Sequence, residues 1–352
     1  MTVKVIAEAG TCTGSVEWAH AAIESAAEVG CWGFKTQILT EDLAAVDSPR
    51  YDRLVGPRSQ REAFADQIPR EAWAEVQAHC KEVGLEWFAS VWDFEGIDLC
   101  ESLGVDYYKI GSADITYLDL IAAVANTGKT VFLSTGAADL EEIDEAVAVI
   151  GDFAPLVLMA CTLSYPCEPE DAYLGRLVVL RSDLVFETAA TAWGYSDHTT
   201  LTDISGFAVA AGASYLEKHF TITPGQGGDH DFALNPYQMA DYVDHADRAY
   251  RLLWPNPATR ILAAEMPARY LARRSLHALT DIGIGSPVII GHNAKWQRPT
   301  GGIEPNEKWV GPLVAARSIL AGSRIQWEDL VVDRSSQPRL SGSDRLAPRN
   351  LG

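Results

Sequence analysis

Two histidines stand just beyond apolar stretches that read as strands. The stretch WGYSDHTTL ends in Asp197, His198 and two threonines, and GASYLEKHFTI carries Glu217 and His219 in the same situation. Neutral imidazoles are common ligands of divalent transition metals such as Mn²⁺, Fe²⁺ or Zn²⁺. Two such ligands leave coordination positions open, as in a catalytic site. Alternation along a strand predicts that Asp197 and Glu217 point away from the histidines and act as supporting groups.

Two lysines close other apolar stretches, in WGFKTQI (Lys35) and DYYKIGSAD (Lys109). An unpaired ammonium at the inner end of a strand is costly to bury, so each lysine needs an anionic partner. One interpretation is an ion pair with Glu8 or Asp114. The other is that both lysines bind phosphate or carboxylate, helped by hydroxyls. The hydroxyls concerned are those of Ser112, Ser134 and Ser196. Lysines, hydroxyls and a metal together would suit a small phosphorylated anion.

Eight apolar runs that end in polar residues recur through the first two thirds of the chain. They are VKVIAEAG, WGFKTQI, LEWFASV, DYYKIGSAD, TVFLSTG, LVLMACTLSYP, AWGYSDHT and SYLEKHFT. Helix-like segments alternate with them. Ser15 is expected to cap the start of one, and Asp139, Glu141 and Glu142 are expected in the first turn of another, where the helix dipole favours acidic residues. This alternation predicts a (β/α)₈ barrel. An open doubly wound sheet is the competing architecture, but no GxGxxG follows the first run.

A barrel would bring the polar strand ends together, because the carboxyl ends of all its strands meet on one face. The predicted neighbours are Glu8, Lys35, Lys109, Ser134, His198 and His219. The barrel is expected over residues 1–254, followed by a proline-containing linker over 255–271. A small β-rich domain is expected over 272–333; it is short for independent stability and so should pack on something. The polar tail over 334–352 is expected to be disordered.

Composition excludes some classes of partner. The chain has 352 residues, of which 47% are hydrophobic, and a formal net charge of -20. Such acidity argues against nucleic acid and against anionic membranes. The sequence shows no membrane span and no signal peptide, and its six cysteines show no paired spacing, so we expect a cytoplasmic protein with reduced thiols. Cys12 is expected to pack rather than to react.

Several of these motifs resemble the sialic acid synthase family. IAEAG, KIGSAD, STG, YSDHT, EKHFT, GGDHDFALNP and RPTGGI occur in the family's order and spacing, over about residues 3–332. The resemblance implies that the protein condenses phosphoenolpyruvate with an open-chain N-acyl amino sugar. The implied products are a 2-keto-3-deoxy sugar acid and phosphate.

The resemblance also implies a role for each matching residue. His198 and His219 would hold a divalent metal, Mn²⁺ by preference, with Mg²⁺ or Co²⁺ as alternatives. Glu8 is the candidate for proton transfer. The residues expected at phosphoenolpyruvate are Lys35, Ser90, Lys109, Ser112, Ser134 and Ser196. Those expected at the sugar are Gln37, Asp114, Tyr165, Asp229 and Arg298.

The C-terminal domain resembles type III antifreeze proteins (a SAF domain). In the family this domain covers the barrel of a partner, so a domain-swapped homodimer is implied. The sequence departs from the family pattern after the first strand and in the expected pocket wall, at Val91, Trp92 and Ala160, which points to an acceptor other than N-acetylmannosamine. Two other readings stay open: a different metal-dependent barrel aldolase or hydrolase, and a non-catalytic sugar-phosphate sensor.

Overall fold

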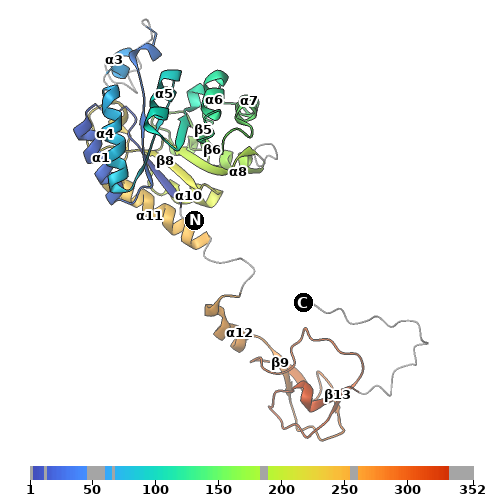
Figure 1. Cartoon of the computed structure of the whole chain (residues 1–352). Coiled ribbons are helices and arrows are strands. Elements are labelled where there is room, and N and C mark those ends of the chain that lie inside the picture. The colour runs from blue at the N-terminus through green and yellow to red at the C-terminus, as the bar shows by residue number, and fades with distance from the viewer. Residues whose placement is uncertain are drawn as a thin grey trace. The chain divides into compact units, whose positions relative to one another are not determined.

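The computed structural model describes residues 3–11, 14–45, 60–65, 68–182, 189–253 and 261–332. The chain divides into two compact units (Figure 1), the first containing the described residues up to 253 and the second those from 261 onward. Cys12 and the tail over 334–352 lie outside the described residues. Within the described residues, no helix has the length and apolarity needed to span a bilayer.

The first unit is a closed barrel of eight parallel strands, so the predicted (β/α)₈ fold is confirmed and the open sheet is excluded. The strands are β1 (Lys4–Glu8), β2 (Gly33–Gln37), β3 (Glu86–Ser90), β4 (Tyr107–Ile110), β5 (Thr130–Ser134), β6 (Leu156–Cys161), β7 (Ala192–Asp197) and β8 (Tyr215–His219). The barrel closes where β8 pairs with β1. In that register Glu8 lies opposite His219 on one side and Lys35 on the other.

Helices follow the strands, and most of them cover the outside of the barrel (Figure 1). They are α1 (Val16–Glu28), α3 (Gln60–Ala65), α4 (Trp73–Val83), α5 (Phe94–Leu103), α6 (Leu118–Ala125), α7 (Leu140–Ile150), α8 (Gly175–Ser182), α10 (Ile204–Ala211) and α11 (Pro236–Leu253). The predicted Ser15 cap is present, since Ser15 accepts a hydrogen bond from the backbone of Trp18. Asp139, expected in the first turn of α7, is instead its N-cap and forms a capping box with Glu142.

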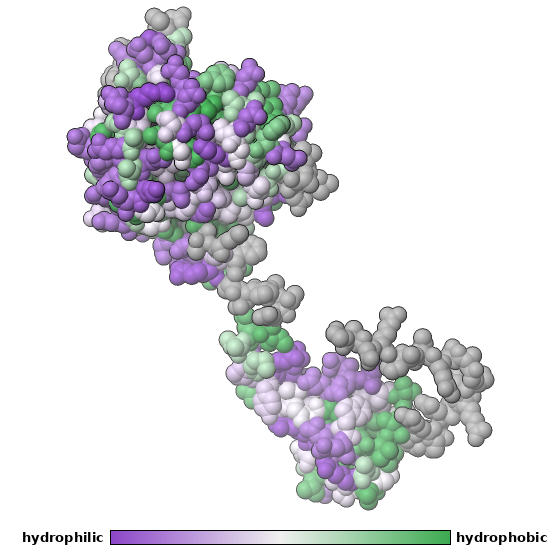
Figure 2. Space-filling model, viewed as in Figure 1, coloured by the Kyte–Doolittle hydropathy of each residue, from purple (hydrophilic) through white to green (hydrophobic). Residues whose placement is uncertain are grey.

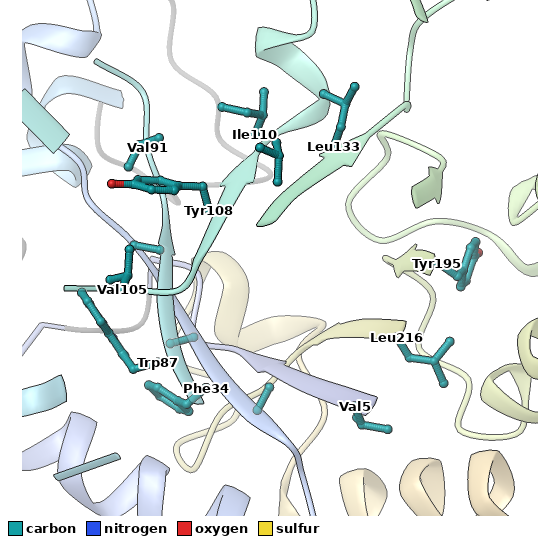
Figure 3. Close-up of a cluster of buried hydrophobic side chains, with 14 of the residues drawn as sticks. Val5, Phe34, Trp87, Val91, Val105, Tyr108, Ile110, Leu133, Tyr195 and Leu216 are labelled. Atoms are coloured by element: carbon teal, nitrogen blue, oxygen red, sulfur yellow. The ribbon is translucent and has the colours of Figure 1, made fainter. Parts of the chain in front are cut away.

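Alternation along the strands divides the buried side chains into two layers. Ile6, Phe88, Phe132, Val157 and Met159 form one cluster, inside the barrel. A larger cluster packs between the strands and the surrounding helices; Figure 3 shows part of it. The apolar plug inside the barrel leaves room for polar side chains only near the strand ends, which is where the predicted site residues lie.

The second unit is small and rich in β-structure. It contains α12 (Met266–Ala272), β9 (Ser275–Ala278), β10 (Pro287–Val288), β11 (Ala294–Gln297), β12 (Leu313–Ala315) and β13 (Leu330–Val332). Strands β10, β12 and β13 form one antiparallel sheet, and β9 pairs with β11 in another. Its own hydrophobic cluster includes Leu276, Ile303 and Ile325. Helix α12 lies in the stretch expected to be a linker.

Candidate active site

A cavity of about 540 Å³ opens at the carboxyl ends of the barrel strands. All six predicted neighbours line it, as do five other residues from the predicted site. Its lining consists of Glu8, Lys35, Gln37, Phe64, Ser90, Trp92, Lys109, Gly111, Ser112, Ala113, Ser134, Leu163, Ser164, Tyr165, Ser196, His198, Glu217 and His219. The strand ends therefore converge on one polar chamber, with carboxylates, lysines, hydroxyls and imidazoles in its wall.

Lys35 is held between a carboxylate and a hydroxyl at the base of this chamber. Its Nζ lies 2.5 Å from Glu8 Oε2 and donates to Ser90 Oγ at 2.8 Å. The other oxygen of Glu8 accepts from Gln37 Nε2 at 2.9 Å and from the backbone of Gly10 at 3.1 Å. Burial raises the pKa of Glu8, while the charge of Lys35 opposes this rise. Glu8 is thus an ion-pair partner of Lys35 and also a carboxyl with unusual affinity for a proton.

Lys109 pairs with Glu217 rather than with Asp114. Lys109 Nζ lies 3.7 Å from Glu217 Oε1, and Lys35 Nζ lies 3.9 Å from Glu217 Oε2. Ser196 Oγ donates to Glu217 Oε1 at 3.1 Å. Burial opposes ionisation of Glu217, but Lys109 and Lys35 lower its pKa below the ordinary value. An ionised carboxylate therefore lies between the two cations of the cavity.

The prediction that Glu217 points away from His219 is wrong. The two residues are two positions apart in β8, so the period of the strand places both on the same side, and both line the cavity. Lys218, between them, faces outward and donates to Asp197 Oδ2 at 2.8 Å. Asp197 does behave as predicted, because it is a buried group outside the cavity lining. The period of two along β8 was therefore sufficient to place Glu217 on the same side as His219.

The two histidines face each other across the cavity with their ring centroids 5.5 Å apart. His198 Nδ1 lies 2.8 Å from the carbonyl of Thr162, which leaves Nε2 for a ligand. Burial and the charges of His198 and Lys35 lower the pKa of His219 well below its ordinary value. Burial also disfavours the charged form of His198, but Cys161 and the Thr162 carbonyl raise its pKa.

These imidazoles fit the requirements of a divalent metal with two protein ligands. His219 stays neutral, His198 keeps one nitrogen free, and His219 Nδ1 is buried without a hydrogen-bond partner in the described structure. Among the described residues, no set of three or more His, Cys, Asp or Glu side chains is arranged to hold a metal. Any ion bound here would therefore take its remaining ligands from water or substrate.

Asp229 supports this end of the site from behind. Its Oδ2 accepts from the backbone of Thr11 at 2.8 Å and lies 3.6 Å from His219 Nδ1. Burial raises the pKa of Asp229 to about 6. Gly10 has a φ of 57°, and a Cβ there would lie 2.1 Å from Asp229 Oδ2 and 2.9 Å from His219 Nδ1. The close approach of the first loop to β8 therefore requires glycine.

The remaining predicted site residues divide between the cavity and other places. Ser112 accepts from the backbone of Gly136 at 2.9 Å, and Ser134 Oγ is buried without a hydrogen-bond partner in the described structure. The Tyr165 ring packs on His198 with centroids 4.1 Å apart. Asp114 does not line the cavity, and burial raises its pKa to about 6. Arg298 is an exposed residue of the second unit.

Of the three altered residues expected in the pocket wall, Trp92 lines the cavity and the other two lie elsewhere. Val91 and Ala160 belong to the hydrophobic cluster outside the barrel, and Figure 3 shows Val91 beside Tyr108. Sequence reasoning gave no role to five lining residues, Phe64, Gly111, Ala113, Leu163 and Ser164. Leu163 and Ser164 directly precede Tyr165, so their place after β6 was available as a signal. Phe64 lies in α3 and carries no such signal.

Comparisons with known proteins show which family this chain resembles. The family model described as the NeuB family matches residues 22–254. The spore coat polysaccharide biosynthesis protein SpsE of Bacillus subtilis is 31% identical over 359 residues, covering 95% of each chain. An N,N'-diacetyllegionaminic acid synthase of Legionella pneumophila is 28% identical over 347 residues, covering 94% of this chain and 95% of that protein.

Solved structures of similar fold include proteins with the same kinds of name. A spore coat polysaccharide biosynthesis protein E from Chromobacterium violaceum superimposes with a TM-score of 0.78 at 26% identity, covering 94% of this chain and 100% of that one. An N-acetylneuraminic acid synthetase from Leptospira borgpetersenii gives a TM-score of 0.67 at 26% identity, covering 76% of this chain and 90% of that one.

Proposed function

The chain belongs to the NeuB family, whose members synthesise sugar acids, and from this premise we propose its reaction. The protein joins phosphoenolpyruvate to the aldehyde carbon of an open-chain N-acyl amino sugar and yields a 2-keto-3-deoxy sugar acid and phosphate. The observation that carries this proposal is the joint opening of Lys35, Lys109, His198 and His219 into one cavity. An anionic substrate and a carbonyl oxygen each find a matching group there.

The chemistry follows from the groups around the cavity. The electron pair of the C2–C3 double bond of phosphoenolpyruvate forms the bond from C3 to the aldehyde carbon; the aldehyde oxygen becomes a hydroxyl by taking a proton, and positive charge develops at C2. Water then adds at C2. The bond from C2 to the phosphate oxygen breaks as the new hydroxyl at C2 becomes the keto group, so one proton of the water replaces the one taken by the aldehyde oxygen and the other leaves with phosphate. Lys35 and Lys109 hold the phosphate and carboxylate and stabilise the departing phosphate. Ser112 and Ser134 supply hydroxyls to the same groups, and Ser134 Oγ has no hydrogen-bond partner among the described residues. Ser196 donates its proton to Glu217 Oε1 and borders the same groups.

Glu8 is the residue proposed to receive the proton of the attacking water. Its carboxylate lines the cavity, and Oε2 has no hydrogen-bond donor among the described residues apart from its close ion pair with Lys35. Burial raises the pKa of Glu8 toward the range in which a carboxylate is an effective base. Gln37 and the Gly10 backbone fix the other oxygen, so the basic oxygen has one orientation.

His198 and His219 are proposed to hold a divalent metal, with Mn²⁺ expected and Mg²⁺ or Co²⁺ as alternatives. When bound, the ion would polarise the aldehyde oxygen as a Lewis acid. Asp229 and the Thr162 carbonyl orient the two rings toward the cavity. These contacts keep the imidazoles in place when the sugar enters.

The acceptor is proposed to be an N-acyl amino sugar other than N-acetylmannosamine. Val91 and Ala160 do not support this proposal, because both are buried in the outer hydrophobic cluster. The apolar part of the cavity lining, which Phe64, Trp92 and Leu163 provide, does support it. Such a wall suits a sugar that presents a deoxy or acyl group. A substrate panel in which N-acetylmannosamine is clearly preferred would contradict it.

A homodimer is proposed in which the second unit serves as a SAF-type domain and brings Arg298 to the sugar in the partner's barrel. Arg298 is exposed on the second unit. The second unit also exposes apolar side chains (Figure 2), among them Ile284, Val310 and Leu320. A small unit with this surface is suited to packing on another chain.

The deciding experiment measures phosphate release from phosphoenolpyruvate by metal-stripped protein, with Mn²⁺ or Mg²⁺ restored, across a panel of aldoses and N-acyl hexosamines. We expect release that needs both the metal and one particular sugar, and that disappears in His219→Ala. Release of a sugar product without phosphoenolpyruvate would instead indicate an aldolase or hydrolase. Tight ligand binding with no turnover on any sugar would indicate a sensor.

A further inference from the structure

In the described part of the chain, the charge of Lys109 is paired with a single carboxylate. Among the described residues, Glu217 is the one acidic side chain within ion-pair distance, at 3.7 Å, and Lys109 Nζ otherwise donates to the carbonyl of Ile110 at 3.3 Å. Lys35 is held more securely, because Glu8 lies 2.5 Å from it and Ser90 accepts its hydrogen bond. Lys109 is 3% exposed, so water does little to stabilise its charge.

The other charged groups around Lys109 do not replace Glu217. Burial lowers the pKa of Lys109, Glu217 opposes this most strongly, and Lys35 lowers it further by repulsion. Cys161 and Glu8 favour the charged form with smaller effects, and the charge of Lys109 is felt in turn by Asp114. Without Glu217, the ammonium group would be a buried cation beside a second cation. A group in that position releases its proton.

We propose that Glu217 is a positioning residue that keeps Lys109 protonated, so that the cavity presents two cations to its phosphorylated substrate at neutral and alkaline pH. Ser196 fixes the carboxylate for this task through its hydrogen bond to Oε1. The inference rests on the proposed function, since it takes the ligand of the cavity to be a phosphorylated anion. Glu217 acts through Lys109 and has no assigned contact with the reacting carbons.

Binding of phosphoenolpyruvate to the full-length protein tests this role. Calorimetric titrations would compare the wild type with Glu217→Gln between about pH 7.5 and about pH 9.5, where a phosphate with a second pKa of about 6 is fully ionised. In Glu217→Gln the affinity should fall by at least about tenfold across this range, because one linked proton changes affinity by up to tenfold per pH unit. The wild type should change by less than about threefold.

Two control variants and one double variant separate this effect from loss of structure. Asp197→Asn removes the carboxylate of the buried Asp197–Lys218 pair on the same two strands, outside the cavity lining, and should keep the pH dependence of the wild type. Glu217→Asp keeps the charge and should restore most of the affinity at high pH. In the background of Glu217→Gln, Lys109→Arg should remove the pH dependence, because a guanidinium stays charged throughout this range.

The outcomes distinguish the inference from the function beneath it. If Glu217→Gln loses affinity with rising pH and the two controls behave as stated, the role of Glu217 is established. If the wild type binds phosphoenolpyruvate and Glu217→Gln follows the same pH profile, the inference fails and the proposed function stands. If the wild type does not bind phosphoenolpyruvate at any pH, with or without Mn²⁺, the proposed function fails and the inference falls with it.

Discussion

At the scale of single residues, Gly10 controls how closely the first loop can approach the histidines. Gly10→Ala would place a methyl group 2.1 Å from Asp229 Oδ2, so His219 and Asp229 must move. We expect a loss of activity of about a hundredfold and a loss of stability of at least about 1–3 kcal/mol. Phosphate release and urea unfolding would measure the two effects.

Gly84 provides the matched control for this substitution. Its φ is 85°, but a Cβ there meets no atom within 4 Å. Gly84→Ala therefore carries the same backbone strain without the collision, and it should lower stability while leaving turnover near the wild-type rate. Equal loss of turnover in both variants would show that the close approach at Gly10 has no bearing on the site.

Asp229 gives the protein a pH-dependent stability with a definite sign. Burial raises its pKa from 3.8 to about 6, so the folded protein binds this proton more tightly than the unfolded chain does. The stability that the protonated form contributes is complete below pH 3.8 and is lost as the pH rises through about 6. Asp229→Asn removes this loss. Relative to wild type, the variant should gain up to about 3 kcal/mol in unfolding free energy between about pH 4 and about pH 7.5.

Urea unfolding of both proteins across this range would measure the difference. An offset between the two proteins that stays constant with pH would contradict the raised pKa. Activity should fall in Asp229→Asn even where its stability increases, since the asparagine no longer presents a carboxylate to His219. This separation of stability from activity is expected of a group whose desolvation is retained for its function.

At the scale of elements, strands β7 and β8 are joined by one pair of charges that lies outside the barrel mouth. Asp197 and Lys218 form the outer pair, and both are buried. Removing one partner of a buried ion pair leaves the other charge uncompensated, so Asp197→Asn should lower the unfolding free energy by about 3–5 kcal/mol. Asp197→Leu combined with Lys218→Met should recover much of that loss, because neither charge remains.

Thermal or chemical unfolding of the single and double variants would measure this coupling. A double variant that is less stable than Asp197→Asn alone would contradict the pairing. The Asp197–Lys218 pair matters for the site because of where it lies. The same two strands carry the ligand histidines, so the outer pair fixes the spacing of β7 and β8 without entering the cavity.

Strand pattern explains how much of the site could be read from sequence. His198, Lys35 and Glu8 were predictable because each closes an apolar run, and parallel strands in a barrel end on one face. The position of Val91 also follows from this alternation, since it comes one residue after the inward-facing Ser90. Phe64 was out of reach, because it lies in a helix beyond β2 whose path depends on tertiary packing rather than on any local repeat.

At the scale of the whole molecule, a barrel and a β-rich unit could both be expected from the texture of the sequence. The helix α12 between them could not, because Met266–Ala272 is short and its apolar side chains are exposed rather than arranged on a buried face. Nothing in a local pattern could assign Arg298 to a site either. That assignment comes from resemblance to a family and needs a test on the assembled protein.

Mixing two inactive variants would supply that test. His219→Ala lacks one metal ligand, and Arg298→Ala lacks the arginine proposed to serve the partner chain. If each second unit completes the partner's barrel, random reassortment of the two dimers leaves about a quarter of the sites intact. Phosphate release should therefore return to about a quarter of the wild-type rate after mixing. Two variants that stay inactive together, although mixed dimers form, would exclude the exchange.

The hydrogen bond between Thr11 and Asp229 has a consequence for how the protein folds during its synthesis. It joins residues 218 positions apart, and the pairing of β1 with β8 spans a comparable length of chain. Synthesis proceeds from the N-terminus, so Glu8 and Lys35 leave the ribosome long before the strand that must neighbour Glu8 has been made. A nascent chain shorter than about residue 230 therefore carries an open seam with its lysines uncompensated by Glu217. Chaperones that bind exposed strand edges would therefore bind the nascent chain during translation, and they would not bind the folded enzyme.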